Sequence, residues 1–240
     1  MQQNSSSTFS KSVKSVGAAA LMTAAFAGHA AAESNGRAQG LLLLHAKEQI
    51  AVMEDVLPKL ARQGCTLWQR GSLVGAQGNL DIGSPGRFVL LDCSEPVLSG
   101  AESYAALAPL FDADESLRAV EGPLLFRTAD EASDDKHVER DYVLKISHYN
   151  NRDPKARNED LEQINSIAGG RKNTWKTEGF IAGLRAVGMP TPDEVVVIHY
   201  DNPQQGEDFR NSNPDILKQI GTFNEQHLTE FTYLSAAPDR

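Results

Sequence analysis

Apolar and polar residues follow two patterns along the chain, one typical of strands and the other of amphipathic helices. Residues 39–46 (QGLLLLHA) form an apolar run of strand length. Residues 48–64 carry apolar side chains at helical spacing and end on a glycine, which predicts a helix and its stop. Residues 65–75 and 87–94 are strand-like and enclose a turn-rich segment, so they predict a hairpin.

The same order of elements is predicted twice. A second helix over residues 103–120, with a break at Pro109, and a strand over residues 122–128 complete the first half. The second half has predicted strands 141–150, 179–187, 194–200 and 229–235 and predicted helices 156–168 and 214–226. The order βαββαβ is typical of the ferredoxin-like arrangement, with both helices on one face of an antiparallel sheet. We therefore expect the open faces of the two sheets to pack together as an α+β barrel.

The two halves also match in sequence, which predicts a tandem duplication. A shift of 107 positions superimposes Trp68 on Trp175 and residues 87–96 on residues 194–203. Matches that share one offset over about thirty residues rarely arise by chance. The predicted units are a first repeat over 38–129, a charged linker over 130–140 and a second repeat over 141–236.

The first 32 residues have the order of a secretory signal peptide. Two lysines precede the apolar stretch 16–28, and Ala30 and Ala32 supply the small side chains of a cleavage site. The apolar stretch is too short to span a bilayer, which disfavours a transmembrane anchor. We expect a mature chain that begins at Glu33 and is exported, to the periplasm.

The charge of the expected mature chain limits its partners. It retains 21 basic and 32 acidic residues, a net charge of −11. Binding to nucleic acid or to an anionic membrane needs a concentrated basic surface. Neither is therefore an expected partner.

Three segments resemble the dimeric α+β barrel superfamily, and above all its small barrel domains of unknown function. They are VLPKLARQGCTLWQRG (56–71), GRFVLLDC (86–93) and SYAALAPL (103–110). The resemblance implies a barrel of two ferredoxin-like units. The superfamily includes antibiotic-biosynthesis-type monooxygenases, muconolactone isomerase-like enzymes and haem-binding chlorite dismutases, so it allows haem as a cofactor. No motif carries catalytic residues over from these groups.

Histidines supply the main candidates for chemistry, because the chain has no phosphate-binding loop, nucleophile elbow, C-x-x-C or H-E-x-x-H motif. His148 and His199 end two predicted strands, but at opposite edges of the sheet and about 15–20 Å apart, so no shared metal site is expected. His199 is a candidate general base, with His148 and Tyr149 as further proton-transfer candidates. The structural alternative is a hydrogen-bonded histidine at a strand end.

Alternate side chains of the strand 143–149 point to opposite faces. The more apolar face, which we expect to pack against the helices, carries Leu144, Ile146 and His148. The other face carries Lys145, Ser147 and Tyr149. We expect these three side chains to point between the sheets, where they either line a ligand cavity or fill the interface as hydrogen-bonded pairs.

Four further ligand-binding candidates come from the comparison of the halves: Asp92, Tyr200, Trp68 and Trp175. The 107-residue shift places Asp92 at the position of His199, as expected if one half kept a site, although ordinary drift explains the difference equally well. The same shift places Cys93 at the position of Tyr200. Trp68 and Trp175 open their strands, where they either stack on a flat ligand or fill the core.

Cys65 and Cys93 are the only cysteines and lie on the two strands of the first predicted hairpin. Opposed residues of a hairpin have a constant index sum, and the sum for this pair centres the turn on Asn79, inside the turn-rich segment. A disulfide can form there in an oxidising compartment. Two buried free thiols are the alternative.

The sequence thus predicts an exported, monomeric barrel that holds a small apolar or aromatic molecule between its sheets. Such a barrel acts either as a binding or accessory protein or, alternatively, as a cofactor-free oxygenase or isomerase. A haem-binding protein is a third hypothesis.

Overall fold

The computed structural model describes residues 38–128 and 139–239. The predicted signal peptide and most of the predicted linker lie outside these residues. The first half contains β1 (Gln39–His45), η1 (Lys47–Gln49), α1 (Ile50–Arg62), β2 (Cys65–Gly78), β3 (Arg87–Cys93), α2 (Ala101–Ala113) and β4 (Arg118–Arg127). The second half contains β5 (Asp141–Tyr149), α3 (Pro154–Gly169), β6 (Lys176–Ala182), β7 (Arg185–Val187), β8 (Glu194–Tyr200), α4 (Pro203–Ser212), α5 (Pro214–His227) and β9 (Leu228–Pro238).

Several elements differ from the sequence prediction. The predicted strand 179–187 is divided, because β6 ends at Ala182 and β7 begins at Arg185. Helix α2 ends at Ala113, because Asp114 is extended and its carboxylate accepts the backbone N–H of Ala46 and of Ser116, so β4 already begins at Arg118. Helix α4 was not predicted, since its sequence is almost entirely polar; the side chain of Asn202 caps it. The predicted break at Pro109 is wrong, because Pro109 lies within the continuous helix α2, as Pro58 does within α1.

Eight of the nine described strands form a closed antiparallel barrel. The order around the barrel is β1-β3-β2-β9-β5-β8-β6-β4, and pairing of β4 with β1 closes the ring. The short strand β7 pairs with β4 outside this ring. The first half contributes the strand order β4-β1-β3-β2, and the second contributes β9-β5-β8-β6. When the barrel strands are numbered along the chain within each half, both orders are 4-1-3-2.

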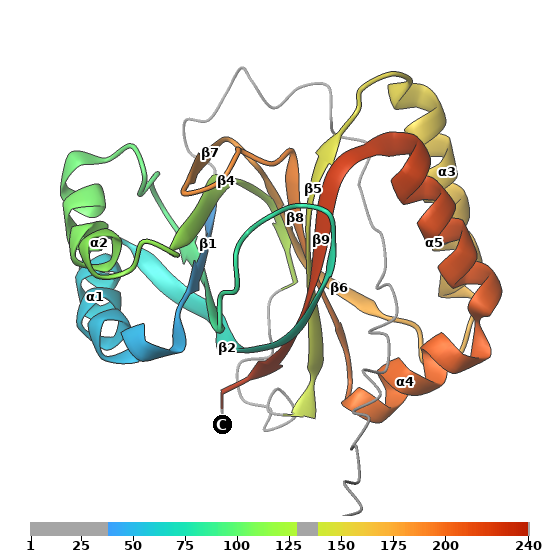
Figure 1. Cartoon of the computed structure of the whole chain (residues 1–240), viewed down its shortest axis with the longest axis horizontal. Coiled ribbons are helices and arrows are strands. Elements are labelled where there is room, and N and C mark those ends of the chain that lie inside the picture. The colour runs from blue at the N-terminus through green and yellow to red at the C-terminus, as the bar shows by residue number, and fades with distance from the viewer. Residues whose placement is uncertain (1–37, 129–138, 240) are drawn as a thin grey trace, which may run out of the picture.

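The helices lie outside the barrel on two opposite sides (Figure 1). Helices α1 and α2 cover one side, and α3 and α5 cover the other, each over its own apolar cluster. Within the described residues, no helix has the length and apolarity needed to cross a membrane.

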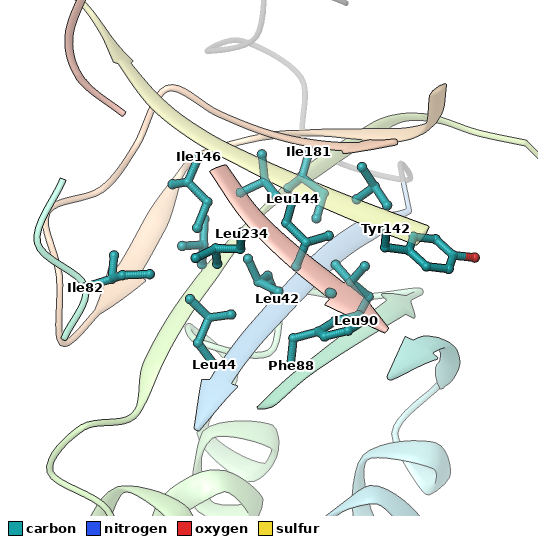
Figure 2. Close-up of a cluster of buried hydrophobic side chains, with 14 of the residues drawn as sticks. Leu42, Leu44, Ile82, Phe88, Leu90, Tyr142, Leu144, Ile146, Ile181 and Leu234 are labelled. Carbon is teal, nitrogen blue, oxygen red and sulfur yellow. The ribbon is translucent and has the colours of Figure 1, made fainter. Parts of the chain in front are cut away.

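Apolar side chains fill the barrel interior (Figure 2). They include Leu42, Leu44, Phe88, Leu90, Leu144, Ile146, Val195, Val197 and Leu234. The loop 79–86 covers one end of this core with Leu80 and Ile82. Apolar side chains already fill the middle of the interior. The expected ligand between the two sheets therefore does not lie there.

Candidate functional site

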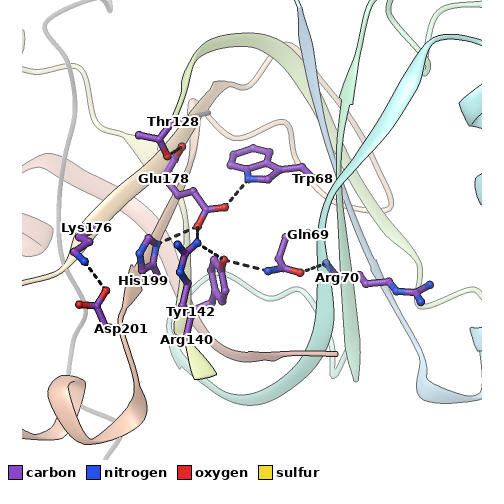
Figure 3. Close-up of polar contacts among 10 residues, drawn as sticks. All are labelled: Trp68, Gln69, Arg70, Thr128, Arg140, Tyr142, Lys176, Glu178, His199 and Asp201. Atoms are coloured by element: carbon purple, nitrogen blue, oxygen red, sulfur yellow. Dashed lines mark hydrogen bonds and ion pairs between the residues drawn. The ribbon is translucent and has the colours of Figure 1, made fainter. Parts of the chain in front are cut away.

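A cluster of polar side chains occupies the other end of the barrel interior, where β5 begins and β8 ends (Figure 3). We call it the polar-end cluster; it consists of Trp68, Gln69, Arg140, Tyr142, Glu178 and His199. Glu178 is its centre. Its Oε1 accepts a hydrogen bond from Nε1 of Trp68 at 2.7 Å. Its Oε2 lies 3.0 Å from Nδ1 of His199 and 3.3 Å from Nη1 of Arg140.

Two β-bulges aim Trp68 and Glu178 into the interior. Trp68 of β2 is the extra residue opposite Leu91 and Leu90, which are consecutive in the paired strand β3. Glu178 of β6 is the extra residue opposite Ile198 and Val197 of β8. An extra residue of this kind re-aims its side chain. The two pairs of opposed residues are related by the 107-residue shift, so Trp68 is structurally equivalent to Glu178. The sequence match of Trp68 with Trp175 is therefore wrong.

Trp68 and Glu178 face each other across the barrel, because β2 and β6 are opposite members of the ring. The indole ring also lies against Gly179: a Cβ atom there would come within 2.2 Å of Cη2 of Trp68. The space beside the Trp68–Glu178 hydrogen bond thus admits only a glycine.

His199 and Tyr142 are paired residues of neighbouring strands, with ring centroids 5.6 Å apart. Tyr142 is fully buried, and its hydroxyl accepts Nε2 of Gln69 at 3.1 Å. Burial raises the pKa of Tyr142, so its hydroxyl stays protonated. The predicted strand-end position of His199 is correct, but the residue is buried in a network rather than exposed.

Glu178 is only 1 % exposed. Burial by itself raises the pKa of its carboxyl, but the adjacent side chains of His199, Trp68 and Tyr142 outweigh burial, so the pKa lies below its ordinary value. Glu178 is therefore ionised near neutral pH. The ionised carboxylate of Glu178 lies 3.0 Å from Nδ1 of His199, and a histidine placed beside a carboxylate in this way is a candidate general base.

Arg127 and Asp92 extend the polar end toward solvent. Nη1 of Arg127 lies 3.0 Å from Oδ2 of Asp92, and its guanidinium lies 5.4 Å from the ring centroid of Trp68. Their side chains are 22 % and 27 % exposed, so a molecule arriving from solvent can reach them. Asp92 follows Leu90 on the interior face of β3.

Lys145, Ser147 and Tyr149 do not point between the sheets, contrary to the prediction. They face helices α3 and α5, where all three donate to the carboxylate of Glu194; Lys145 does so at 2.5 Å. Leu144 and Ile146 take the interior instead. The alternation did not reveal the orientation because both faces of β5 are buried, and because Glu194 offsets the charge of Lys145.

The remaining candidates lie away from the polar end. Trp175 packs edge-on against Phe209 beneath the helices, with centroids 5.2 Å apart, and Tyr200 lies in the same apolar cluster. His148 is at the opposite end of β5 from Tyr142, so His148 and His199 are not brought together. Within the described ranges no cluster of three or more acidic, histidine or cysteine side chains is arranged to hold a metal ion.

Cys65 and Cys93 pair directly across β2 and β3 and are joined by a disulfide bond. The bond lies on the helix-facing side of the sheet, in the apolar cluster under α1 and α2. It fixes the start of the strand that carries Trp68 and the end of the strand that carries Asp92.

Sequence reasoning missed Glu178, Tyr142, Arg140 and Arg127. Glu178 occupies a bulge, which periodicity does not reveal, and Arg140 was assigned to the linker. An acidic residue within the apolar run around residues 178–182 was the available signal.

Two hollows lie on the outer surface, away from the polar-end cluster. One, of about 450 Å³, runs between α3 and α5 over Ile164 and Phe223. The other, of about 540 Å³, lies beside the start of α2. The first has a rim of amide and charged side chains that includes Asp160, which pairs with Nε2 of His227 at 2.7 Å. Asp160 is 43 % exposed, whereas Glu178 is buried, so this pair differs from Glu178 and His199 in its contact with solvent.

No protein-family model and no curated protein sequence matches the chain. Solved structures match it in fold. An anthrone oxidase-like protein is 14% identical with a TM-score of 0.55, over 86% of this chain and 93% of that chain. A variant of the chlorite dismutase from Candidatus Nitrospira defluvii is 11% identical with a TM-score of 0.52, over 86% of this chain and 93% of that chain. At these identities the likeness shows the fold alone: an eight-stranded antiparallel barrel with outer helices, as in dimeric α+β barrel proteins.

Proposed function

We propose that this α+β barrel binds a small aromatic molecule at its polar end and oxidises it with molecular oxygen, using His199 as the general base. The observation that carries the proposal is the buried pair of Glu178 and His199, flanked by the rings of Trp68 and Tyr142. An anthrone oxidase-like protein of the same fold makes an anthrone a suitable first substrate.

The substrate is placed at the end of the barrel, because the rest of the interior is packed. Arg127, Asp92 and Arg140 are partly exposed charged residues at this end, and the ring of Trp68 lies beside Arg127. A base that takes a proton from an aromatic substrate gives a resonance-stabilised anion, and the proton now on His199 supplies the positive charge that faces it.

The proposed reaction balances without a further reductant. His199 removes a proton from the anthrone methylene, and the carbanion adds to oxygen to give a hydroperoxide after protonation. Loss of water from the hydroperoxide leaves the quinone carbonyl. One oxygen atom stays on the ring carbon, and the other leaves as water with the two methylene hydrogens.

Oxygen uptake by the mature protein with 1,8-dihydroxyanthrone tests this function. We expect equal amounts of oxygen consumed and quinone formed, above the uncatalysed background. His199→Gln should lower the rate by roughly a hundredfold or more, the usual contribution of a positioned general base. Asp215→Asn, on the outer face of α5, is the matched control and should keep the wild-type rate.

A wild-type rate equal to the background would contradict the oxygenase. Binding of the anthrone without oxygen uptake would instead favour a binding or accessory protein that uses the same site. The two outcomes are separated by isothermal titration calorimetry under nitrogen.

The haem that the family resemblance allows does not fit the described packing. Apolar side chains fill both the interior and the layer beneath α3 and α5. We therefore propose no step through haem, and expect the purified protein to stay colourless when haem is added.

We further propose that the two halves are tandem ferredoxin-like repeats and that the chain is exported. The equivalent strand orders and the equivalent bulges at Trp68 and Glu178 support the duplication. The signal-like N-terminus and the disulfide support export. N-terminal sequencing of the periplasmic protein tests the expected cleavage before Glu33.

A further inference from the structure

We infer that Asp92 sets the charge preference of the polar end and makes it select uncharged aromatic ligands over aromatic carboxylates. The inference rests on the proposed function, because it concerns the ligand of the same site. It starts from the charges that the described residues place there.

The charged side chains at the polar end are matched in pairs, two of them on the interior side and the exposed pair Lys176–Asp201 beside His199. Arg140 lies 3.3 Å from Glu178, and Arg127 lies 3.0 Å from Asp92. With His199 in its neutral form, which is the form that acts as a base, these four groups sum to zero. A ligand that arrives already ionised therefore finds no unmatched positive charge to offset the loss of its hydration.

An uncharged acid avoids this cost. Its proton moves to His199 on deprotonation, so the new anion faces a new cation beside Glu178, and the site as a whole stays neutral. The charge balance thus favours hydroxyaromatic compounds and related carbon acids over carboxylates of the same shape.

Asp92 controls this balance and is separate from the base. Glu178 is buried against His199, so its removal would disturb the base itself. Asp92 is partly exposed and pairs with Arg127. Nε of Arg127 is buried and has no hydrogen-bond partner among the residues that the structure describes. Without the charge of Asp92, Arg127 becomes an unmatched cation beside the ring of Trp68, which is the arrangement that binds an aromatic carboxylate.

The position of Asp92 supports this role. Asp92 and His199 are equivalent under the 107-residue shift, and each lies on the interior face of the third barrel strand of its half, β3 or β8. One half thus supplies the base at this position, and the other supplies the charge that keeps the site neutral.

Isothermal titration calorimetry with 2-naphthol and 2-naphthoate at neutral pH tests the inference on the full mature chain. The two probes have the same ring system and differ in charge. We expect the wild type to bind 2-naphthol more tightly than 2-naphthoate. Asp92→Asn should shift the ratio of the two Kd values toward 2-naphthoate by about tenfold, because the unmatched, partly exposed charge of Arg127 attracts the carboxylate.

Two further variants serve as controls. Asp215→Asn removes the carboxylate of another aspartate–arginine pair, with Arg171 at 2.8 Å on the outer surface, and should leave the ratio unchanged. Adding Arg127→Gln to Asp92→Asn removes the unmatched cation and should restore the preference for 2-naphthol.

The outcomes separate this inference from the proposed function. If both probes bind the wild type and Asp92→Asn leaves the ratio unchanged, the charge preference is wrong and the ligand site stands. Tighter binding of 2-naphthoate by the wild type overturns the inference in the same way. If neither probe binds the wild type at millimolar concentration, the proposed ligand site itself is wrong.

Discussion

At the scale of single residues, Glu178 is the group on which the polar end depends. It joins a tryptophan, a histidine and an arginine through one carboxylate. Its lowered pKa means that the ionised form stabilises the folded state. That stabilisation is complete above the ordinary glutamate pKa of about 4.3 and is lost as the pH falls below it, through the lowered folded-state pKa.

Glu178→Gln should therefore lower the free energy of unfolding at pH 7 by about 1–3 kcal/mol, since the amide keeps an acceptor for Trp68 but loses the charge beside Arg140 and His199. The difference from wild type should shrink as the pH falls below about 4. Urea denaturation at several pH values measures both effects. A difference that does not change with pH would show that folding does not lower the pKa of the Glu178 carboxyl.

Gly179→Ala should destabilise the protein by about 1–3 kcal/mol, because the new methyl group would overlap the rigid ring of Trp68. Gly221→Ala in α5 is the control: nothing lies within 4 Å of its added methyl group, so the variant should gain about 0.5–1 kcal/mol from helix propensity. Thermal denaturation compares the two. Equal stability of Gly179→Ala and wild type would mean that Trp68 moves freely away from Glu178.

His199 shows what a sequence can and cannot say about one side chain. Strand periodicity correctly placed it at the end of β8. As an isolated strand-end residue, it would have little effect on stability when mutated. Its contacts with Glu178 and Tyr142 link strands that are distant in sequence, and they predict a larger loss for His199→Ala.

At the scale of elements, the hairpin of β2 and β3 carries the covalent link of the fold. The constant index sum that predicted the pairing of Cys65 with Cys93 holds at this end of the hairpin, and the bulge at Trp68 then shifts the register by one residue. Local turn chemistry was therefore sufficient to find the hairpin, but not its bulge.

The disulfide should resist alkylation without reductant, and the double variant Cys65→Ser, Cys93→Ser should lose about 2–4 kcal/mol of stability. Mass spectrometry of denatured, alkylated protein checks the bond, and denaturant unfolding checks its contribution. Labelling of both thiols in protein purified and denatured without reductant would contradict it.

The strands were easier to predict than their orientation. The runs 41–44 and 195–198 are apolar throughout and are buried on both faces, so alternation could not decide which side faces the helices. Lys145 made the error worse, because a buried lysine requires a partner such as Glu194 that only the fold reveals. Helix α4 lacked an apolar stripe and gave no helical signal.

At the scale of the whole molecule, closure of the barrel predicts a monomer. Each half already provides the sheet that the other half covers, through the β2–β9 and β4–β6 pairs. Light scattering at micromolar concentration should therefore give the mass of one mature chain. A stable dimer would show that the barrel does not satisfy all of its pairing surfaces within one chain.

The closed ring also determines what an incomplete chain would do. In the described part of the molecule only the three-residue strand β7 is left as a sheet edge, so the finished barrel offers little template for the addition of foreign strands. A chain interrupted after residue 128 would instead expose two long edges, β2 and β4, together with an apolar sheet face. Such a fragment would pair with its own copies or aggregate. Protection against aggregation therefore begins only when the last strand, β9, closes the ring.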